Sequence, residues 1–291
     1  MARPGEFEFH QPASLEEASM LLRRLGPGAA ILAGGTDIVP RMRLRKISPR
    51  HIVSIKRIAG LDGISFDGRT LHIGALARFN DILSSPVVGQ HLPVLAGVAG
   101  MIGSHQVRNL ATIGGNICNA APSADSAPIL VVLGARLRIY SLQGTRETPL
   151  EAFFRGPGAV HLAPGEILTR ILVERPPPGV KVAYYKHEIR EALEIAITGV
   201  AVAIEMDGDG VCRSARVAVG ACAPTPVRAR RAEDILKGSR LEMETVERAA
   251  LAASEDISPI DDVRSCSRYR RDMTAISLGR AIDRAMGGKA G

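Results

Sequence analysis

Two short glycine turns lie far apart in this chain, Ala33–Asp37 (AGGTD) and Thr112–Asn116 (TIGGN), and each adjoins or contains an apolar run typical of a buried strand. Glycine has no Cβ, so the backbone at such a turn can approach a ligand closely. Consecutive exposed amide N–H groups form a concavity that suits a pyrophosphate. The sequence therefore predicts that the two turns are halves of one anion-binding cradle.

The motifs of the common nucleotide and hydrolase sites are absent from this sequence. No GxGxxG follows the first strand and no GxxxxGK[ST] occurs, which excludes a Rossmann fingerprint and a phosphate loop of the usual kind. GxSxG and HExxH are also missing. A Gly-Gly pair alone is most often a tight turn, and this structural interpretation stays open for each turn taken singly.

Length and composition indicate a folded protein of several domains. A chain of 291 residues can hold two or three domains, and its 46% hydrophobic content with both charge signs interspersed argues against disorder. We find no apolar run long enough to span a bilayer and no signal peptide, so we expect a cytoplasmic protein. The four cysteines form no CxxC pair and lie near no histidine spacing typical of a metal site, so we expect no metal ligands.

The net charge of +7 raises the possibility of nucleic-acid binding. The arginines are scattered and not interleaved with aromatic residues, which is unlike a nucleic-acid footprint. Two local groups could equally be solvated faces or subunit contacts: Arg41, Arg43, Arg45, Lys46 and Arg50, and Arg228, Arg230 and Arg231. We therefore expect no nucleic-acid partner and keep a non-redox binding protein that uses the basic surface as an alternative.

Residues 1–55 are expected to form a small α/β lobe. Ser14 and Glu17 make a capping box before an amphipathic helix, which Gly26-Pro27-Gly28 ends. Strands are predicted at 29–33 and 52–55, with a helix from about Ile38 capped by Thr36 or Asp37. This strand, glycine turn and helix would place amide donors against an anion.

Residues 56–176 are expected to form a second, α+β lobe, and residues 180–291 a further domain after the linker Pro176-Pro177-Pro178-Gly179. The second lobe is predicted to contain strands at 61–64, 70–74, 129–133, 136–140 and 167–173 and helices at 79–83 and 93–102. In the last domain we expect strands at 182–186, 198–206 and 215–221, then helices at 229–237, 242–254 and 267–286. The fold class is α+β, ending in a three-stranded antiparallel sheet with a helical bundle.

The segment from Gly103 to Asp125, GSHQVRNLATIGGNICNAAPSAD, resembles the FAD-binding segment of the flavoprotein subunit of molybdenum hydroxylases. That family includes carbon monoxide dehydrogenase medium chains and xanthine dehydrogenase FAD subunits. The resemblance covers the whole chain, through AGGTD and TIGGN to the segment Tyr184–Ala196, YYKHEIREALEIA. It implies a two-lobed FAD-binding domain of the PCMH type, an oxidoreductase subunit, and FAD as cofactor.

The resemblance also implies which residues bind FAD. The first turn would wrap the pyrophosphate and flank the flavin through Ala30, Ile31, Leu32, Ala33, Gly34, Gly35, Thr36 and Asp37. The second turn would close the other side through Thr112, Gly114, Gly115 and Asn116. No catalytic residue is implied, and His105 is expected to be structural because the family binds FAD noncovalently.

Three further positions carry family roles, each with a structural alternative. Asp125 would accept hydrogen bonds from ribose or ribityl hydroxyls, or would cap the helix that follows it. Ile167 or Leu168 would pack against the adenine or the ring system, or would belong to the core. Lys186 would place a positive charge near the flavin and raise its potential, or would be a solvated lysine at a strand end.

The function implied is an electron-transfer subunit of a heterotrimer. A small partner chain would carry two 2Fe-2S clusters and a large one the molybdopterin cofactor, and two heterotrimers would pair as a dimer. Electrons would pass from the clusters to FAD and on to an external acceptor. A stand-alone flavin-dependent oxidase is the other enzymatic alternative, although the residues after the linker are few for a substrate domain.

Overall fold

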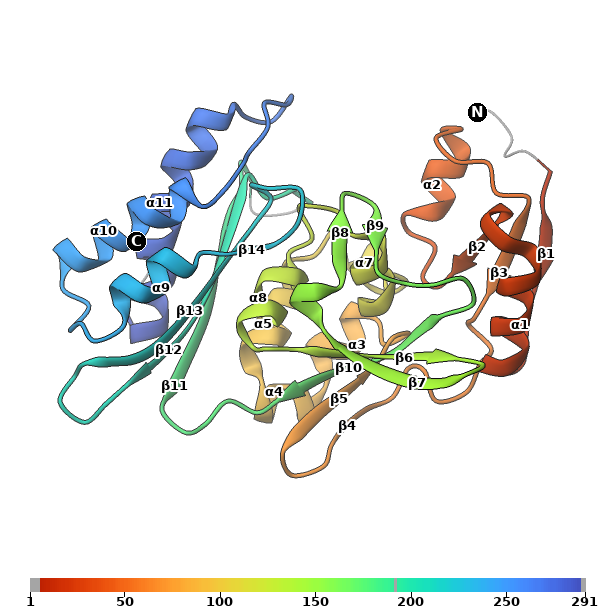
Figure 1. Cartoon of the computed structure of the whole chain (residues 1–291), viewed down its shortest axis with the longest axis horizontal. Coiled ribbons are helices and arrows are strands. Elements are labelled where there is room, and N and C mark those ends of the chain that lie inside the picture. The colour runs from red at the N-terminus through yellow and green to blue at the C-terminus, as the bar shows by residue number, and fades with distance from the viewer. Residues whose placement is uncertain (1–5, 191–192, 289–291) are drawn as a thin grey trace.

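The computed structural model describes residues 6–190 and 193–288. Glu191 and Ala192, within the last segment of the resemblance, lie outside the described residues, as do positions 1–5 and 289–291 of the outer predicted domains. The described residues form a three-stranded, a five-stranded, a four-stranded and a two-stranded sheet. Figure 1 shows the N-terminal lobe at one end, the five-stranded sheet in the middle and the last sheet with its helices at the other end.

The N-terminal lobe is a parallel sheet with strand order β1-β3-β2, packed against one long helix. Its elements are β1 (Glu8–His10), α1 (Leu15–Leu25), a 3-10 turn (Gly26–Gly28), β2 (Ala29–Leu32), α2 (Ile38–Arg43) and β3 (His51–Ser54). The predicted capping interaction starts α1, since Ser14 Oγ accepts from Glu17 N–H at 3.1 Å. Glu17 in turn accepts from the N–H of Ala13 at 2.8 Å, one residue earlier than a capping box requires.

The middle part is built on an antiparallel sheet with strand order β4-β5-β10-β6-β7. The strands are β4 (Ile64–Phe66), β5 (Thr70–Gly74), β6 (Arg136–Ser141), β7 (Gly144–Pro149) and β10 (Ile167–Glu174), with the hairpin β8 (Phe154–Gly156) and β9 (Ala159–Val160) beside them. The helices are α3 (Phe79–Ser84), α4 (Pro86–His91), α5 (Pro93–Met101), α6 (His105–Arg108), α7 (Ile113–Asn119) and α8 (Ser126–Val132), and a 3-10 turn covers Leu150–Ala152.

The predicted strand at 129–133 is wrong, because these residues lie in and after the helix α8. Every residue of α8 is buried, so the sequence shows an unbroken apolar run with no period to separate helix from strand. The strand expected at 61–64 is displaced: β4 begins at Ile64.

The C-terminal part has four strands rather than the three expected, in the order β11-β12-β13-β14. The long strands are β11 (Val180–His187), β12 (Thr198–Met206) and β13 (Cys212–Gly220). The fourth, β14, is only Val227–Arg228 and pairs with β13, and so short a strand leaves no alternating pattern in the sequence. The helices α9 (Arg230–Leu236), α10 (Met243–Glu255) and α11 (Ser267–Met286) follow near their predicted bounds.

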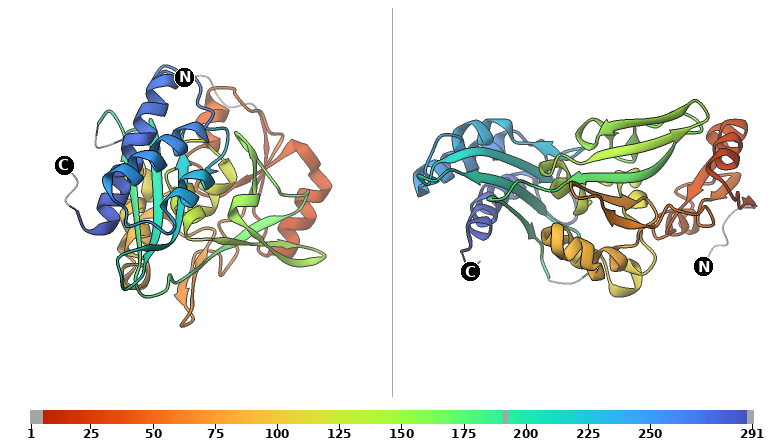
Figure 2. Two further views of the ribbon diagram at one scale, coloured as in Figure 1. Left: turned by 60° about the vertical axis from the view of Figure 1, so that its left-hand side comes forward. Right: turned by 90° about the horizontal axis from the view of Figure 1, so that it is seen from below.

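This last sheet is buried on both faces, and Figure 2 shows its ribbon from two further directions. On one face Tyr184, Ala201, Ala203 and Ala218 join the core of the middle part. On the other face Ala183, Val200, Val202, Val217 and Val219 pack with residues of α9, α10 and α11. The strands therefore consist of nearly continuous apolar residues. Among the described residues, no helix is long and apolar enough to cross a membrane.

Candidate functional site

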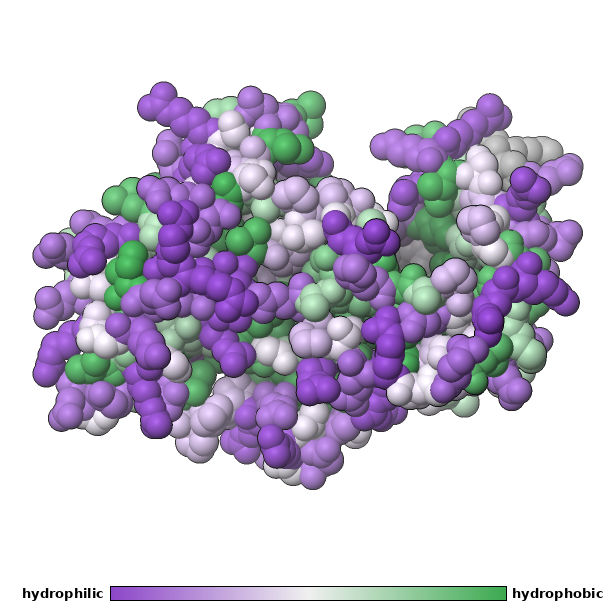
Figure 3. All heavy atoms as spheres, in the orientation of Figure 1, coloured by the Kyte–Doolittle hydropathy of each residue, from purple (hydrophilic) through white to green (hydrophobic). Residues whose placement is uncertain are grey.

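A cavity of about 680 Å³ lies between the N-terminal lobe and the middle part, and both glycine turns line it. Its volume is within the range of about 300 to 1,000 Å³ typical of small-molecule and cofactor sites. Figure 3 shows that this face of the molecule is hollowed between α2 and the β8–β9 hairpin, with hydrophobic residues visible inside the hollow. The cavity is thus placed to receive a ligand from solvent.

The two turns touch each other at the cavity. A Cβ on Gly34 would lie 2.2 Å from the carbonyl oxygen of Leu110 and 3.0 Å from the Cα of Ala111, the residue before the second turn. A Cβ on Gly115 would lie 3.7 Å from the Cβ of Ala33. The predicted convergence of the turns is therefore present in the folded chain.

The first turn has free amide donors. Within the described part of the chain, the N–H groups of Gly34, Gly35 and Thr36 donate to no acceptor. Gly35 has φ of 89°, in the left-handed region that glycine adopts without strain. Three successive unpaired amides beside a cavity form the kind of concave donor set that binds an anion.

The backbone amides of the second turn are hydrogen-bonded to other groups of the protein. Ile113 N–H donates to Ala77 O at 3.0 Å and Gly114 N–H to Ala75 O at 2.9 Å. Thr112 is the N-cap of α7, and its Oγ accepts from Gly115 N–H at 3.1 Å. A Cβ on Gly114 would lie 2.6 Å from both the Cβ and the carbonyl oxygen of Ala75. This turn therefore forms a closely packed wall of the cavity.

Most of the residues named from the sequence line the cavity. They are Ala30, Ile31, Ala33, Gly34, Gly35, Thr36, Asp37, Thr112, Gly114, Gly115, Asn116, Ile167 and Leu168. Leu32 ends β2, and it, Asp125 and Lys186 lie outside the lining that the described residues form. Asn116 accepts from Ser126 Oγ at 2.6 Å, which ties the second turn to the start of α8.

Asp125 and Lys186 meet in a buried ionic cluster between α8 and β11. Lys186 Nζ lies 3.3 Å from Asp125 Oδ2 and 2.8 Å from Glu188 Oε2, and only 2% of the Lys186 side chain is exposed. Tyr184 donates from its hydroxyl to Asp125 Oδ1 at 2.8 Å. Burial raises the pKa of Asp125 although Lys186 and Tyr184 favour its charged form. Neither structural alternative holds: Asp125 makes no side-chain cap to α8, and Lys186 is buried.

Several cavity residues were not predicted from the sequence to lie at the site, among them Arg41 and Cys118. Arg41 follows Asp37 by four residues across the start of α2, a spacing that brings the charges together. Burial raises the pKa of Asp37, and the neighbouring Arg41 partly offsets this. Burial also raises the pKa of the Cys118 thiol to about 12, so the thiol stays protonated and unreactive at neutral pH.

These features fit a cofactor with a diphosphate bridge and a flat apolar ring. The unpaired amides of the first turn supply donors for phosphate oxygens. The close approach at Gly34 leaves no room for a Cβ beside the second turn. Ile31, Ile167 and Leu168 add apolar surface to the same cavity.

Family models match this chain over almost its whole length. Residues 5–176 match the family described as FAD binding domain in molybdopterin dehydrogenase. Residues 183–285 match the CO dehydrogenase flavoprotein C-terminal domain. A putative xanthine dehydrogenase FAD-binding subunit of Escherichia coli K12 is 35% identical over 286 residues, 97% of each chain. The carbon monoxide dehydrogenase medium chain of Hydrogenophaga pseudoflava is 36% identical and covers 97% of this chain and 98% of its own.

Solved structures show the same fold over almost the whole length. A chain of carbon monoxide dehydrogenase from Hydrogenophaga pseudoflava superposes with a TM-score of 0.95 at 36% identity, covering 98% of this chain and 99% of its own. A chain of quinoline 2-oxidoreductase from Pseudomonas putida 86 gives a TM-score of 0.92 at 28% identity, with coverage of 98% and 99%. The chain belongs to the family of FAD-binding medium subunits of molybdenum hydroxylases, the oxidoreductases that include carbon monoxide and xanthine dehydrogenases.

Proposed function

We propose that this chain is the electron-transfer subunit of a heterotrimeric molybdenum hydroxylase. It would accept electrons from 2Fe-2S clusters in a small partner chain and deliver them to an external acceptor, while a large chain with the molybdopterin cofactor oxidises the substrate. The single observation that carries this proposal is the cavity shared by both glycine turns. We further propose a dimer of heterotrimers in the cytoplasm and a division of the chain into 1–55, 56–176 and 180–291.

The residues of the cavity would hold FAD, which supplies the redox chemistry when bound. The amides of Gly34, Gly35 and Thr36 would donate to the diphosphate, with the Thr36 hydroxyl beside them. Gly114 and Gly115 let the opposite wall approach closely. Ile167 and Leu168, buried at the start of β10, would exclude water from the apolar parts of the cofactor.

The cluster of Asp125, Tyr184, Lys186 and Glu188 would fix the C-terminal sheet against α8 behind the cavity. Its two carboxylates, Asp125 and Glu188, face the single positive charge of Lys186. We keep Asp125, Leu32 and Lys186 as proposed cofactor contacts. The net charge of this cluster, and not that of Lys186 alone, would tune the flavin.

The alternatives differ in what they require of this chain. A stand-alone oxidase needs substrate to bleach the flavin of the isolated subunit. A non-redox protein that binds through basic surface needs unpaired cations. Arg228 is paired with Glu233 at 2.6 Å, Arg230 with Glu151 at 2.6 Å and Arg231 with Asp256 at 2.6 Å. These ion pairs disfavour the second alternative for the group of Arg228, Arg230 and Arg231.

The proposal is tested by purifying a tagged copy from its native host under mild conditions. We expect a small iron-sulfur chain and a large molybdenum chain to co-purify, and substrate to bleach the flavin in the complex but not in the isolated subunit. Flavin bleached by substrate in the isolated subunit would support the stand-alone oxidase. A colourless protein released by salt from an anionic support would support the non-redox alternative.

A further inference from the structure

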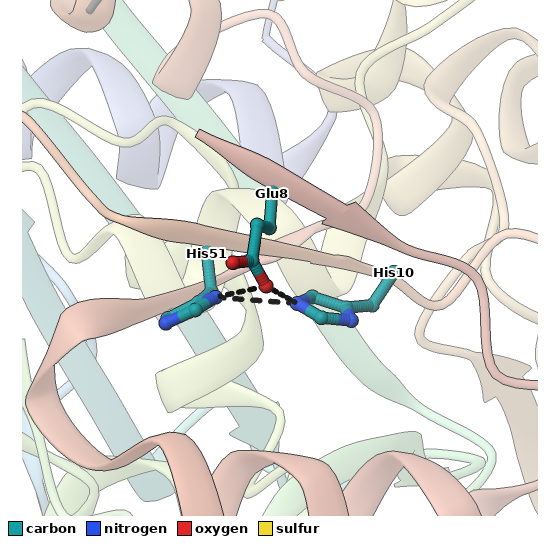
Figure 4. Close-up of side chains that lie close together, drawn as sticks. All are labelled: Glu8, His10 and His51. Carbon is teal, nitrogen blue, oxygen red and sulfur yellow. Dashed lines mark hydrogen bonds and ion pairs between the residues drawn. The ribbon is translucent and has the colours of Figure 1, made fainter. Parts of the chain in front are cut away.

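The N-terminal lobe brings together Glu8, His10 and His51, three potential metal ligands outside the cofactor cavity. In the parallel pairing of β1 with β3, Glu8 lies opposite His51 and His10 lies two residues further along β1. Residues at i and i+2 of a strand share a face, so all three side chains meet on one side of the sheet. Figure 4 shows the two rings converging on the Glu8 carboxylate.

The ligand atoms already have the spacing of a tetrahedral site. His51 Nδ1 lies 3.3 Å from Glu8 Oε2 and 3.3 Å from His10 Nε2, and His10 Nε2 lies 3.7 Å from Glu8 Oε2. Zinc bonds of about 2.0 to 2.1 Å in a tetrahedron set neighbouring ligand atoms about 3.3 to 3.4 Å apart. Two of the three separations match that edge, and a small rotation of Glu8 shortens the third.

Burial favours the same conclusion. The His10 and His51 side chains are 20% and 21% exposed, so packing holds the rings in place. The Glu8 side chain is 72% exposed, so it is free to adjust and leaves a fourth position open to water. Two imidazoles with one carboxylate suit zinc, whereas calcium and magnesium prefer all-oxygen sites.

We propose that Glu8, His10 and His51 form a zinc site with a water molecule in the fourth position. Zinc there would join β1, an edge strand, to the central strand β3. Because it would bind the folded lobe and not the unfolded chain, zinc would stabilise the protein.

The experiment uses the untagged full-length chain, stripped with a chelator and titrated with zinc against a chromophoric competitor. We expect one ion per chain. Removing one of three ligands in His10→Ala or His51→Ala is expected to lower the affinity at least about tenfold. Glu8→Gln should also weaken binding, and this exposed side chain can change without disturbing the core. His161→Ala, a change at an exposed histidine elsewhere, should leave the affinity unaltered.

Two further readouts keep the proposal open to refutation if a histidine variant folds poorly. Cobalt in place of zinc should give the intense visible bands of a four-coordinate ion, and Glu8→Gln should alter them. Zinc should raise the melting temperature of the natural chain and raise that of the His10→Ala/His51→Ala variant less. Equal zinc affinity in the natural chain and Glu8→Gln, or the weak spectrum of six-coordinate cobalt, would overturn the proposal.

Discussion

The two glycine turns meet at one cavity, yet their backbone amides have different partners. In the first turn, the N–H groups of Gly34, Gly35 and Thr36 have no acceptor within the described chain. In the second, Gly114 donates to Ala75 O and Gly115 to Thr112 Oγ. Both glycine pairs therefore permit close packing, but only the first leaves its amide donors unpaired within the described chain.

The difference shows that a glycine pair acquires its role from its neighbours. The first turn leaves β2 and has no strand or helix to absorb its amides before α2 begins at Ile38. The second turn opens α7, where Thr112 and the backbone beside β5 take up the amides. Changes in the first turn should therefore alter chiefly cofactor binding, and changes in the second chiefly stability.

The largest effect is expected from Gly34→Ala. The new Cβ would lie 2.2 Å from the Leu110 carbonyl, so the two turns would have to separate. Bringing the separated turns together again on FAD would cost about 3 kcal/mol of overpacking strain, which would lower FAD affinity about 100-fold. The ratio of flavin to protein absorbance and a fluorescence titration measure this. Gly89→Ala is the matched control, since its Cβ meets nothing within 4 Å, and full FAD retention by Gly34→Ala would refute the contact.

Gly114→Ala should destabilise the protein even without FAD. Its Cβ would overlap both the Cβ and the carbonyl oxygen of Ala75, and overpacking of this kind costs about 1 to 3 kcal/mol. Urea unfolding of the FAD-free chain measures the loss. Adding Ala75→Gly removes the overlap with the Ala75 Cβ, so the double variant should recover part of the lost stability. An unchanged unfolding midpoint in Gly114→Ala would contradict the packing role of the second turn.

Arg41→Gln tests whether cations assist the first turn. Arg41 lines the cavity and is exposed, so its attraction for a diphosphate should be modest, about 1 kcal/mol or about fivefold in FAD affinity. Because salt screens exposed charges, the difference from the natural chain should shrink as the ionic strength rises. Titrations at two salt concentrations measure it. A salt-independent difference would show that Arg41 acts by packing instead.

Asp37→Asn should have the smallest effect and a defined pH dependence. Burial raises the pKa of Asp37 above its ordinary value of 3.8, so the folded state favours the protonated carboxyl. That stabilisation is complete below pH 3.8 and is lost as the pH rises through the raised pKa. Asp37 makes no side-chain cap to α2, so Asp37→Asn loses no capping hydrogen bond. The variant should therefore gain stability over the natural chain as the pH rises. Unfolding curves across the acid range test this, and a gain confined to low pH would contradict it.

The sequence predicted elements with one-sided burial, and also the long strands β11, β12 and β13, which are buried on both faces. The helix from Leu15 and the strand Thr70–Gly74 stand where their patterns indicated. It failed at α8, where complete burial removes the period, and at β14, which is too short to show one. The glycine turns could be identified as candidate binding turns because the residues on either side of each glycine pair form specific motifs, AGGTD and TIGGN.

The other residues of the candidate sites come together through contacts between segments that are far apart in the sequence. Arg41 enters the cavity only because α2 turns beside the glycine loop. The buried pairing of Asp125 with Lys186 requires the sheet that contains β11 to pack on α8 through β12 and β13. Glu8 and His10 lie on one strand and His51 on another. His51 is too far from the other two in the sequence for a short ligand motif to include it. Such sites arise from strand pairing, which single-sequence patterns do not determine.

Calorimetric titration of the FAD-free chain with FAD and with FMN tests most directly whether the two glycine turns bind a diphosphate. FMN lacks the diphosphate bridge and so would lose at least two hydrogen bonds to a charged acceptor, each worth about 1.5 to 3 kcal/mol. We expect one FAD per chain, bound at least about 100-fold more tightly than FMN. Equal affinity for the two flavins, or no FAD binding at all, would contradict it.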